Sequence, residues 1–437
     1  MNDTDSPRPG LLGAIGPGLI SACVVIGPGS ILTSTGVGAD AGFSKIWVVV
    51  LSVMFMLSYV TMGMRLGAVT QRSNGDLVAQ HLNRFASIVI GISVFFISAT
   101  FQFGNNLGAH SALSAYVPFD YWPVVLNAIV LAVLFGFQDL YRFVERAMTL
   151  FVAMMLIAFA LNLFFAKPDL GELAAGFLPS IGEESGQPIG LPLLGLIGTT
   201  FVMSIAYYQA YLVRFKGLSE KSLSGGMLDA VVSAVIMALI TIMIMSTAAA
   251  VLRGEKIENV GQVANQLQPL FGEKGRAIFC LGLFSAAFSS FIVNSMVGGF
   301  ILADSLKLGS TPSDRAPRVL TAVVLLIGMG VAIYVIKTGI KPVGAIVAAQ
   351  AVTVLASPFI AAAMLWLTSS EAVMGKRRNG PFLKITGTAG LLLLVAMSYY
   401  TASTKVIPAL FPDRNAEVEQ QNSAKLSATP DSPALSE

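Results

Sequence analysis

A Gly-Pro-Gly-Ser tetrad near the N-terminus is the part of this sequence best suited to bind a solute. Gly27, Pro28, Gly29 and Ser30 stand inside a long apolar segment that we place at residues 12–38. Proline removes a helical donor and glycines let the chain unwind, so backbone carbonyls and amides lose their helical partners. Free carbonyls can hold a cation, and amides at the start of the resuming helix can hold an anion. A simple kink between packed helices is the alternative interpretation.

A second group of polar side chains follows in a later apolar segment. Gln102, Asn105, Asn106 and His110 are three or four residues apart, which places several of them along one face of a helix. We predict that Gln102 and Asn105 line a solute pathway, although hydrogen bonds between neighbouring helices would explain the amides equally well. A single imidazole without partners predicts a packing role for His110 rather than a metal or proton site.

Two further places combine polar or aromatic residues with apolar surroundings. Gln350 is an isolated amide in an apolar segment and needs a partner, either a neighbouring helix or a bound solute. Polar and aromatic residues crowd together between positions 203 and 211, which predicts a second unwound stretch around Ala206, Tyr207 and Tyr208. The two tyrosines could instead be core aromatics whose hydroxyls find acceptors.

Neither predicted break contains a carboxylate. Glu145, Asp229 and Asp304 lie near the ends of apolar segments, where we expect contacts with basic loop residues and a structural role. A fully dehydrated divalent cation usually takes at least one carboxylate, so a tight metal site is not expected at these breaks. The sequence shows no hydrolase elbow, phosphate-binding loop or His/Cys metal cluster. We therefore expect no enzyme activity and no cofactor.

Composition determines the elements that must position these residues. The chain has 437 residues, 55% of them hydrophobic and 12% charged, with a mean hydropathy of +0.75. Such values lie far outside soluble globular usage, so we predict an all-α integral membrane protein with about eleven transmembrane helices. The segments are 12–38, 44–66, 86–114, 121–138, 144–166, 191–214, 225–252, 276–303, 317–336, 342–368 and 382–401.

These segments also predict the organisation and orientation of the chain. We expect a short cytoplasmic N-terminus at residues 1–11, a single transmembrane domain at 12–401 and a polar, disordered tail at 402–437. Basic residues are more frequent in the loops that share a side with the N-terminus, which favours a cytoplasmic N-terminus in the plasma membrane. They are spread over short loops rather than gathered in one patch, so lipid, not nucleic acid, is the expected partner. Oligomeric state is left open.

Four separate segments resemble the natural resistance-associated macrophage protein (NRAMP) family of divalent-metal transporters. The resemblance extends over residues 12–401 and implies a leucine-transporter-type fold, with a five-plus-five inverted repeat and broken first and sixth helices. It also implies a metal site between the two breaks. The matching segments are Arg65 to Thr70, Tyr141 to Glu145, Ser357 to Ile360 and Thr368 to Gly375.

The sequence departs from the family pattern where metal would bind. The family's Asp-Pro-Gly-Asn corresponds to Gly-Pro-Gly-Ser at 27–30, and its Met-Pro-His corresponds to Ala-Tyr-Tyr at 206–208, which removes a thioether that favours soft metals. Gln102 and Asn105 align with the family's acidic pair, and Val213 aligns with its histidine. This pattern resembles a divergent NRAMP-related branch, for which proton coupling is not expected.

We therefore predict a secondary transporter that moves a divalent cation, magnesium-like or manganese-like, by alternating access. A carrier of a small organic solute, such as an amino acid or carboxylate, is the alternative, with the amides of Gly29 and Ser30 as an anion cradle. A membrane sensor that binds without transport is a third. The predicted site consists of Gly27, Pro28, Gly29, Ser30, Ala206, Tyr207, Tyr208 and Gln350.

Overall fold

The computed structural model describes residues 25–136, 140–179, 190–220, 223–255, 257, 260–311 and 314–407. These residues form helices and connecting turns, and no strand occurs among them, so the prediction of an all-α protein is confirmed. The helices are α3 (Pro28–Ala41), α4 (Ile46–Thr70), α5 (Asn74–His81), α6 (Arg84–Ser114), α7 (Trp122–Gly136), α8 (Leu140–Ala166), α9 (Leu170–Ala175), α10 (Leu191–Thr200), α11 (Met203–Phe215), α12 (Leu223–Val251), α13 (Val260–Ser305), α14 (Arg315–Thr338), α15 (Pro342–Thr353), α16 (Ser357–Ser369), α17 (Glu371–Met374), η2 (Gly375–Arg377), α18 (Pro381–Thr401) and η3 (Ala402–Val406).

Within the described residues, 9 stretches of helix are long and apolar enough to cross a membrane. The remaining two predicted segments contain shorter helices, α3 and α7. The first part of segment 12–38 lies outside the described residues, as do residues 1–11 and most of the predicted tail. The membrane class of the protein is therefore confirmed, whereas a count of eleven spanning helices is not.

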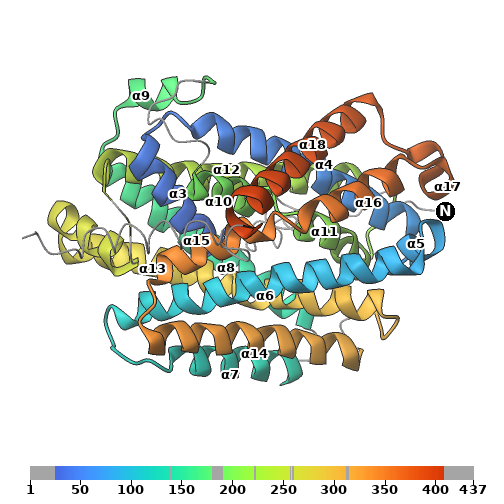
Figure 1. Ribbon diagram of the computed structural model, residues 1–437, viewed down its shortest axis with the longest axis horizontal. Coiled ribbons are helices and arrows are strands. Elements are labelled where there is room, and N and C mark those ends of the chain that lie inside the picture. Colours follow the sequence, from blue (N-terminus) through green and yellow to red (C-terminus); the bar gives the residue numbers. More distant parts are fainter. Residues whose placement is uncertain are drawn as a thin grey trace, which may run out of the picture.

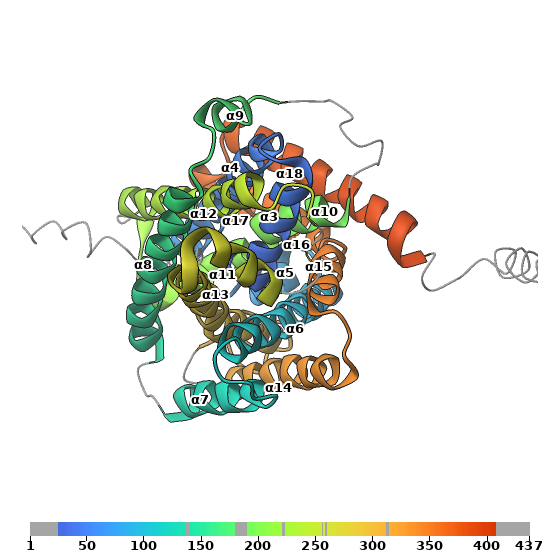
Figure 2. The same cartoon turned by 90° about the vertical axis from the view of Figure 1, so that its left-hand side faces the viewer.

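The helices form one elongated bundle (Figure 1). Long helix α13 packs along α6, α8 and α14, and α7 covers α14 at one edge of the bundle in both views (Figures 1 and 2). On the other side, α4 packs against α11 and α12, and α3 packs against α12 and α10. Short helices α5 and α17 lie at one end of the bundle, and α9 lies at the other (Figure 1).

Two of the candidate spans are interrupted: the sixth predicted segment, where a break is expected nearby, and segment 342–368, where none is expected. The sixth predicted segment divides into α10 and α11 at Phe201 and Val202, whose backbones are not helical (ψ 69° and 99°). The break thus precedes the predicted stretch at 203–211, which forms continuous helix and buries its aromatic side chains there. The predicted segment 342–368 is confirmed as a candidate span at Pro342–Ser369, but residues 354–356 form a turn between α15 and α16 that the sequence does not predict.

Other differences concern the ends of elements. The predicted segment 276–303 is the later part of α13, which starts at Val260 and bends at Gly272 (φ 66°, ψ −166°). Glycine adopts this left-handed backbone without strain, so a bend can occur inside a long helix. At the other end of the chain, helical backbone continues through Val406, past the predicted end of the membrane domain at 401.

Close approach of α4 and α11 depends on two glycines one turn apart. A Cβ at Gly63 would lie 2.2 Å from the carbonyl oxygen of Ala206, and a Cβ at Gly67 would lie 2.4 Å from the carbonyl oxygen of Ala210. Real Cβ atoms do not approach so closely, so the two backbones can touch only because glycine lacks a side chain. This contact fixes the position of α11 against α4.

Candidate functional site

The helical backbone is interrupted at Gly27, directly before α3. Val25 is helical, Ile26 and Gly27 are not, and helix resumes at Pro28. Gly27 is extended (φ −109°, ψ −179°), and no side chain caps the new helix. The Pro28 ring lies against α6, since a Cβ at Gly108 would be only 2.3 Å from Cβ and Cγ of Pro28. The helix is therefore interrupted at the tetrad rather than only kinked, and the Pro28 ring packs against Gly108 of α6.

Gln350 of α15 lies directly beside this break. A Cβ at Gly29 would be 2.6 Å from Cδ and Nε2 of Gln350, and a Cβ at Gly104 of α6 would be 3.3 Å from the same Nε2. Gln350 is 1% exposed, and neither atom of its amide has a hydrogen-bond partner. Leaving buried polar atoms unpaired costs about 1–3 kcal/mol each, so a bound solute or water is the expected partner.

Asn105 reaches the other side of the break. A Cβ at Gly27 would lie 3.1 Å from Asn105 Oδ1 and 3.2 Å from Oγ of Ser290 in α13. Asn105 Nδ2 donates to Gln102 Oε1 (3.3 Å) and to Ser290 Oγ (3.1 Å). Asn105 therefore joins α6 to α13 by a hydrogen bond, as the packing interpretation expects, and it also lies against the break; its part in a solute pathway stays a prediction.

Other amides of α6 have packing roles. Asn127 of α7 donates to Asn106 Oδ1 (2.7 Å), and Asn106 donates to the backbone oxygen of Gln102 (2.9 Å). His110 contacts Ser114 on the same helix through Nδ1 (3.3 Å). Among the described residues, no group of three or more His, Cys, Asp or Glu side chains could hold a metal ion. His110 thus has a hydrogen-bond partner on its own helix, and its packing role stays a prediction.

Ala206, Tyr207 and Tyr208 are buried in α11, but their contacts lie away from the break in α3. The carbonyl oxygen of Tyr207 accepts a hydrogen bond from Asn74 Nδ2 (2.9 Å). The Tyr208 ring packs at 6.4 Å, centroid to centroid, from that of Phe300 in α13. The hydroxyls of both tyrosines are buried without a hydrogen-bond partner. The structure thus groups Pro28 and its neighbours with Asn105 and Gln350, and places the tyrosines in a separate aromatic cluster.

Three polar residues near the breaks were missing from the sequence prediction. Ser290 of α13 contacts the break as described, and Thr33 of α3 lies 3.3 Å, oxygen to oxygen, from Thr199 of α10. Thr33 and Thr199 also bond to carbonyls of their own helices. Small hydroxyl residues inside apolar segments were the available signal, but such residues are too common in membrane helices to single these out.

A cavity of about 380 Å³ opens between α3, α10 and α15. Leu32, Gly36 and Asp40 line it at four-residue spacing on α3, and Val347 lines it one turn before Gln350. Asp40 and Glu255 are its charged lining residues. Carboxylates at the mouth of a cavity raise the local concentration of cations.

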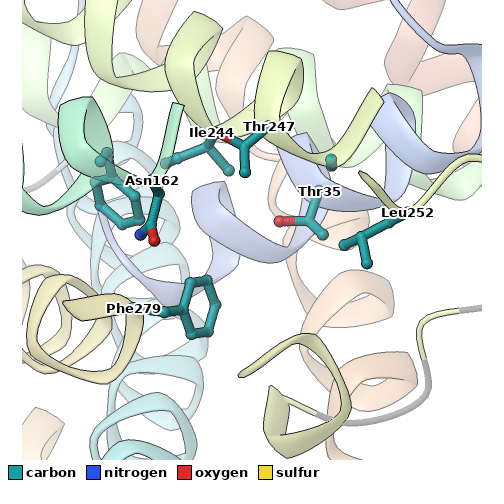
Figure 3. Close-up of a pocket in the computed structure, with 8 residues that line it drawn as sticks. Thr35, Asn162, Ile244, Thr247, Leu252 and Phe279 are labelled. Carbon is teal, nitrogen blue, oxygen red and sulfur yellow. The ribbon is translucent and has the colours of Figure 1, made fainter. Parts of the chain in front are cut away.

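A much smaller cavity, of about 20 Å³, lies between α3, α8, α12 and α13. Figure 3 shows Asn162 of α8 beside it, with Thr35 and Thr247 on the opposite side. Asn162 is 1% exposed, and neither of its amide atoms has a hydrogen-bond partner. The space is large enough for one ordered water but not for a larger solute.

Asp304 departs from the expectation that it contacts a basic loop residue. Its Oδ2 accepts hydrogen bonds from the backbone amide of Gly75 (2.8 Å) and from the hydroxyl of Tyr211. The reason lies in the fold, which brings the first turn of α5 and the end of α11 to α13. Asp229 is buried as well, whereas the side chain of Glu145 lies outside the described residues.

Comparison with known proteins gives consistent matches over most of the chain. A family model described as natural resistance-associated macrophage protein-like matches residues 18–404. The "Divalent metal cation transporter MntH" of Deinococcus radiodurans is 23% identical over 401 residues, covering 89% of each chain. The protein of the same name from Bacillus subtilis is 24% identical over 406 residues, covering 90% of this chain and 92% of its own.

Solved structures show the same architecture. A manganese transporter of Eremococcus coleocola, crystallised with an aromatic bis-isothiourea substituted compound, superposes with a TM-score of 0.81 at 18% identity over 98% of this chain and 93% of its own. A nucleobase-cation-symport-1 family transporter superposes with a TM-score of 0.51 at 15% identity over 92% of this chain and 96% of its own. These proteins have the leucine-transporter-type fold that the sequence predicts. Since one family model spans nearly the whole helical bundle, this integral membrane protein belongs to the natural resistance-associated macrophage protein-like family.

Proposed function

We propose that this protein is a secondary transporter that moves a divalent metal cation across the plasma membrane by alternating access. The observation that carries the proposal is the break at Gly27, seated between Asn105 and Gln350, with the Gln350 amide buried and unpaired. Relatives named as divalent metal cation transporters support the class of solute. Broken helices with bared backbone groups are the usual binding sites of secondary transporters.

The donor atoms around the break favour a hard cation that keeps part of its water. Asn105 Oδ1, Gln350 Oε1 and Ser30 Oγ are neutral oxygens, and Ser30 Oγ is buried without a partner. Hard cations prefer oxygen ligands, and magnesium in particular gives up its water reluctantly. Because the tetrad at 27–30 itself contains no thioether or carboxylate, we propose magnesium or manganese as substrate rather than softer transition metals.

Two polar side chains of α6 bear on whether transport is coupled to protons. Gln102 and Asn105 do not ionise, so they cannot carry protons, and we propose that transport proceeds without proton coupling through them.

With the N-terminus in the cytoplasm, the cavity between α3, α10 and α15 would open to the outside. Asp40 and Glu255 would then attract cations toward Gln350.

Metal-dependent thermal stability of the purified protein tests this proposal. Ligand at about 100 times its dissociation constant stabilises a protein by about 2.7 kcal/mol, so Mg²⁺ or Mn²⁺ should raise the melting temperature. Gln350→Leu should reduce this shift, because it removes an oxygen at the break. Asn162→Leu is the matched control, since it removes an equally buried, equally unpaired amide elsewhere and should keep the shift. Stabilisation by small carboxylates but not by metals would support the organic-solute alternative.

A further inference from the structure

Asp304 is a buried carboxylate whose partners are all neutral. It lies near the end of α13 and is 5% exposed. Its hydrogen-bond partners are the Gly75 amide and the Tyr211 hydroxyl, and the Ser73 side chain lies near it. No Lys or Arg forms an ion pair with Asp304 within the part of the chain that the structure describes. Buried carboxylates are usually paired with a cation, so hydrogen bonds alone must stabilise this charge.

The hydrogen bonds of Asp304 connect three helices at one end of the bundle. Ser73 caps α5, and Gly75 lies in the first turn of α5, where free amides favour a negative charge. A Cβ at Gly75 would be 2.6 Å from Asp304 Oδ2, so this approach requires glycine. Asn74 holds α5 to α11 through the Tyr207 carbonyl, and Ser87 Oγ holds it to α6 by donating to the Gly75 carbonyl (3.0 Å).

The bond between Tyr211 and Asp304 joins two separately packed parts of the bundle. Helix α13 packs extensively on α6, α8 and α14, whereas α11 packs mainly on α4. Direct packing between α11 and α13 is sparse and consists largely of rings: Phe300 lies 6.4 Å from Tyr208 and 6.2 Å from Phe215, centroid to centroid. A polar bond therefore contributes a large share of the attachment between these two helices.

We propose that Asp304 and Tyr211 are positioning residues of the transport cycle, which attach α11 to α13 while the passage is closed at the α5 end and separate when it opens. This inference rests on the proposed alternating access. A charge-assisted hydrogen bond is about twice as strong as a neutral one, so it holds the closed arrangement firmly. When this end opens, water can solvate the carboxylate in place of the tyrosine. The charge is thus satisfied in both arrangements, which lets the attachment be reversible.

Cysteine labelling tests the proposal without requiring any substrate. The background carries Cys23→Ser and Cys280→Ser, and Ser204→Cys places one thiol at a fully buried position of α11 near the break. A membrane-impermeant maleimide is applied to vesicles from each side in turn. Tyr211→Phe removes only the hydroxyl and should raise labelling from the α5 side about tenfold. Ser73→Ala removes the cap of α5 next to the carboxylate and should raise labelling less.

Tyr59→Phe is the matched control. Tyr59 is equally buried, and its hydroxyl donates to the Gly387 carbonyl (2.8 Å), which joins α4 to α18 rather than α11 to α13. Tyr59→Phe should lower thermal stability without changing the rate at which the thiol at position 204 is labelled. Equal labelling rates for Tyr211→Phe, Tyr59→Phe and the parent would overturn the proposal. Failure of metal transport with a preserved Tyr211→Phe effect would overturn the proposed substrate and leave the role of Asp304 intact.

Discussion

Of the glycine-to-alanine changes on α6, Gly108→Ala should push the α3 break furthest from this helix. The Cβ that this change adds would lie 2.3 Å from both Cβ and Cγ of Pro28. The pyrrolidine ring cannot rotate away as a flexible side chain would, because its atoms are tied to the backbone. Gly108 lies inside α6, more than one turn before its end at Ser114, and its neighbours on the helix are buried, so the backbone has little room to yield there.

The size of the effect follows from this distance. Carbon atoms in contact normally lie about 3.5–4.0 Å apart, so α3 and α6 must separate by roughly 1 Å. Overpacking of this kind typically costs about 1–3 kcal/mol, partly offset by about 1 kcal/mol from the better helix propensity of alanine. A shift of this size also moves Gly27 away from Asn105, which lies on α6. We therefore expect a modest loss of stability and a loss of transport of at least tenfold.

Thermal unfolding and cation uptake should be measured together on Gly108→Ala and on a control. Gly330→Ala is suitable, because nothing lies within 4 Å of a Cβ at that position of α14. The control should gain stability, by up to about 1 kcal/mol, and keep full transport. If Gly108→Ala behaved like Gly330→Ala in both assays, Pro28 would not be seated against α6 and the reasoning about the break would be wrong.

Three further changes test other parts of the structure. Gly27→Asp should raise Mn²⁺ affinity, measured by calorimetry, by about tenfold or more, because a Cβ there faces Asn105 Oδ1 at 3.1 Å and a carboxylate would join neutral oxygens; unchanged affinity would place the metal elsewhere. Asn162→Leu should raise the melting temperature if its cavity is dry, since two unpaired polar atoms are removed; a fall would indicate a bound water. The hydrogen bond from Lys337 (2.8 Å), and then its charge, lowers the pKa of the exposed Asp120 carboxyl below 3.8. Asp120→Asn should therefore cost a little stability at neutral pH, and the difference from the parent should vanish as the pH falls below 3.8; a difference that persisted in acid would contradict this pairing.

Local physics made the first break predictable, because Pro28 between two glycines cannot continue an ordinary helix. The break in the sixth segment had no such signal. Polar and aromatic crowding predicted it at residues 203–211, yet the non-helical residues are Phe201 and Val202. Apolar residues like these unwind because of their tertiary surroundings, which single-sequence reasoning does not contain. The turn at 354–356 was missed although Pro358 follows it, since proline is common in membrane helices.

The candidate site and its surroundings also include features that the sequence predicts and features that only the fold reveals. The structure places Gln350 directly against Gly29 of the predicted tetrad, whereas their shared role in binding stays a prediction. Asp304 could not be assigned correctly from sequence. Its partners Gly75 and Tyr211 are more than ninety positions away, and only the fold brings α5, α11 and α13 together.

Uptake into proteoliposomes tests the central claim most directly. Purified protein should be reconstituted and flux of Mg²⁺, Mn²⁺ and Ca²⁺ compared with and without a pH gradient, with Gly108→Ala as the matched inactive variant. The structure predicts saturable uptake of Mg²⁺ or Mn²⁺ that does not depend on the gradient, because neutral oxygens surround the break. Absence of metal flux from folded protein would contradict the account, and flux that required a proton gradient would contradict its view of Gln102 and Asn105.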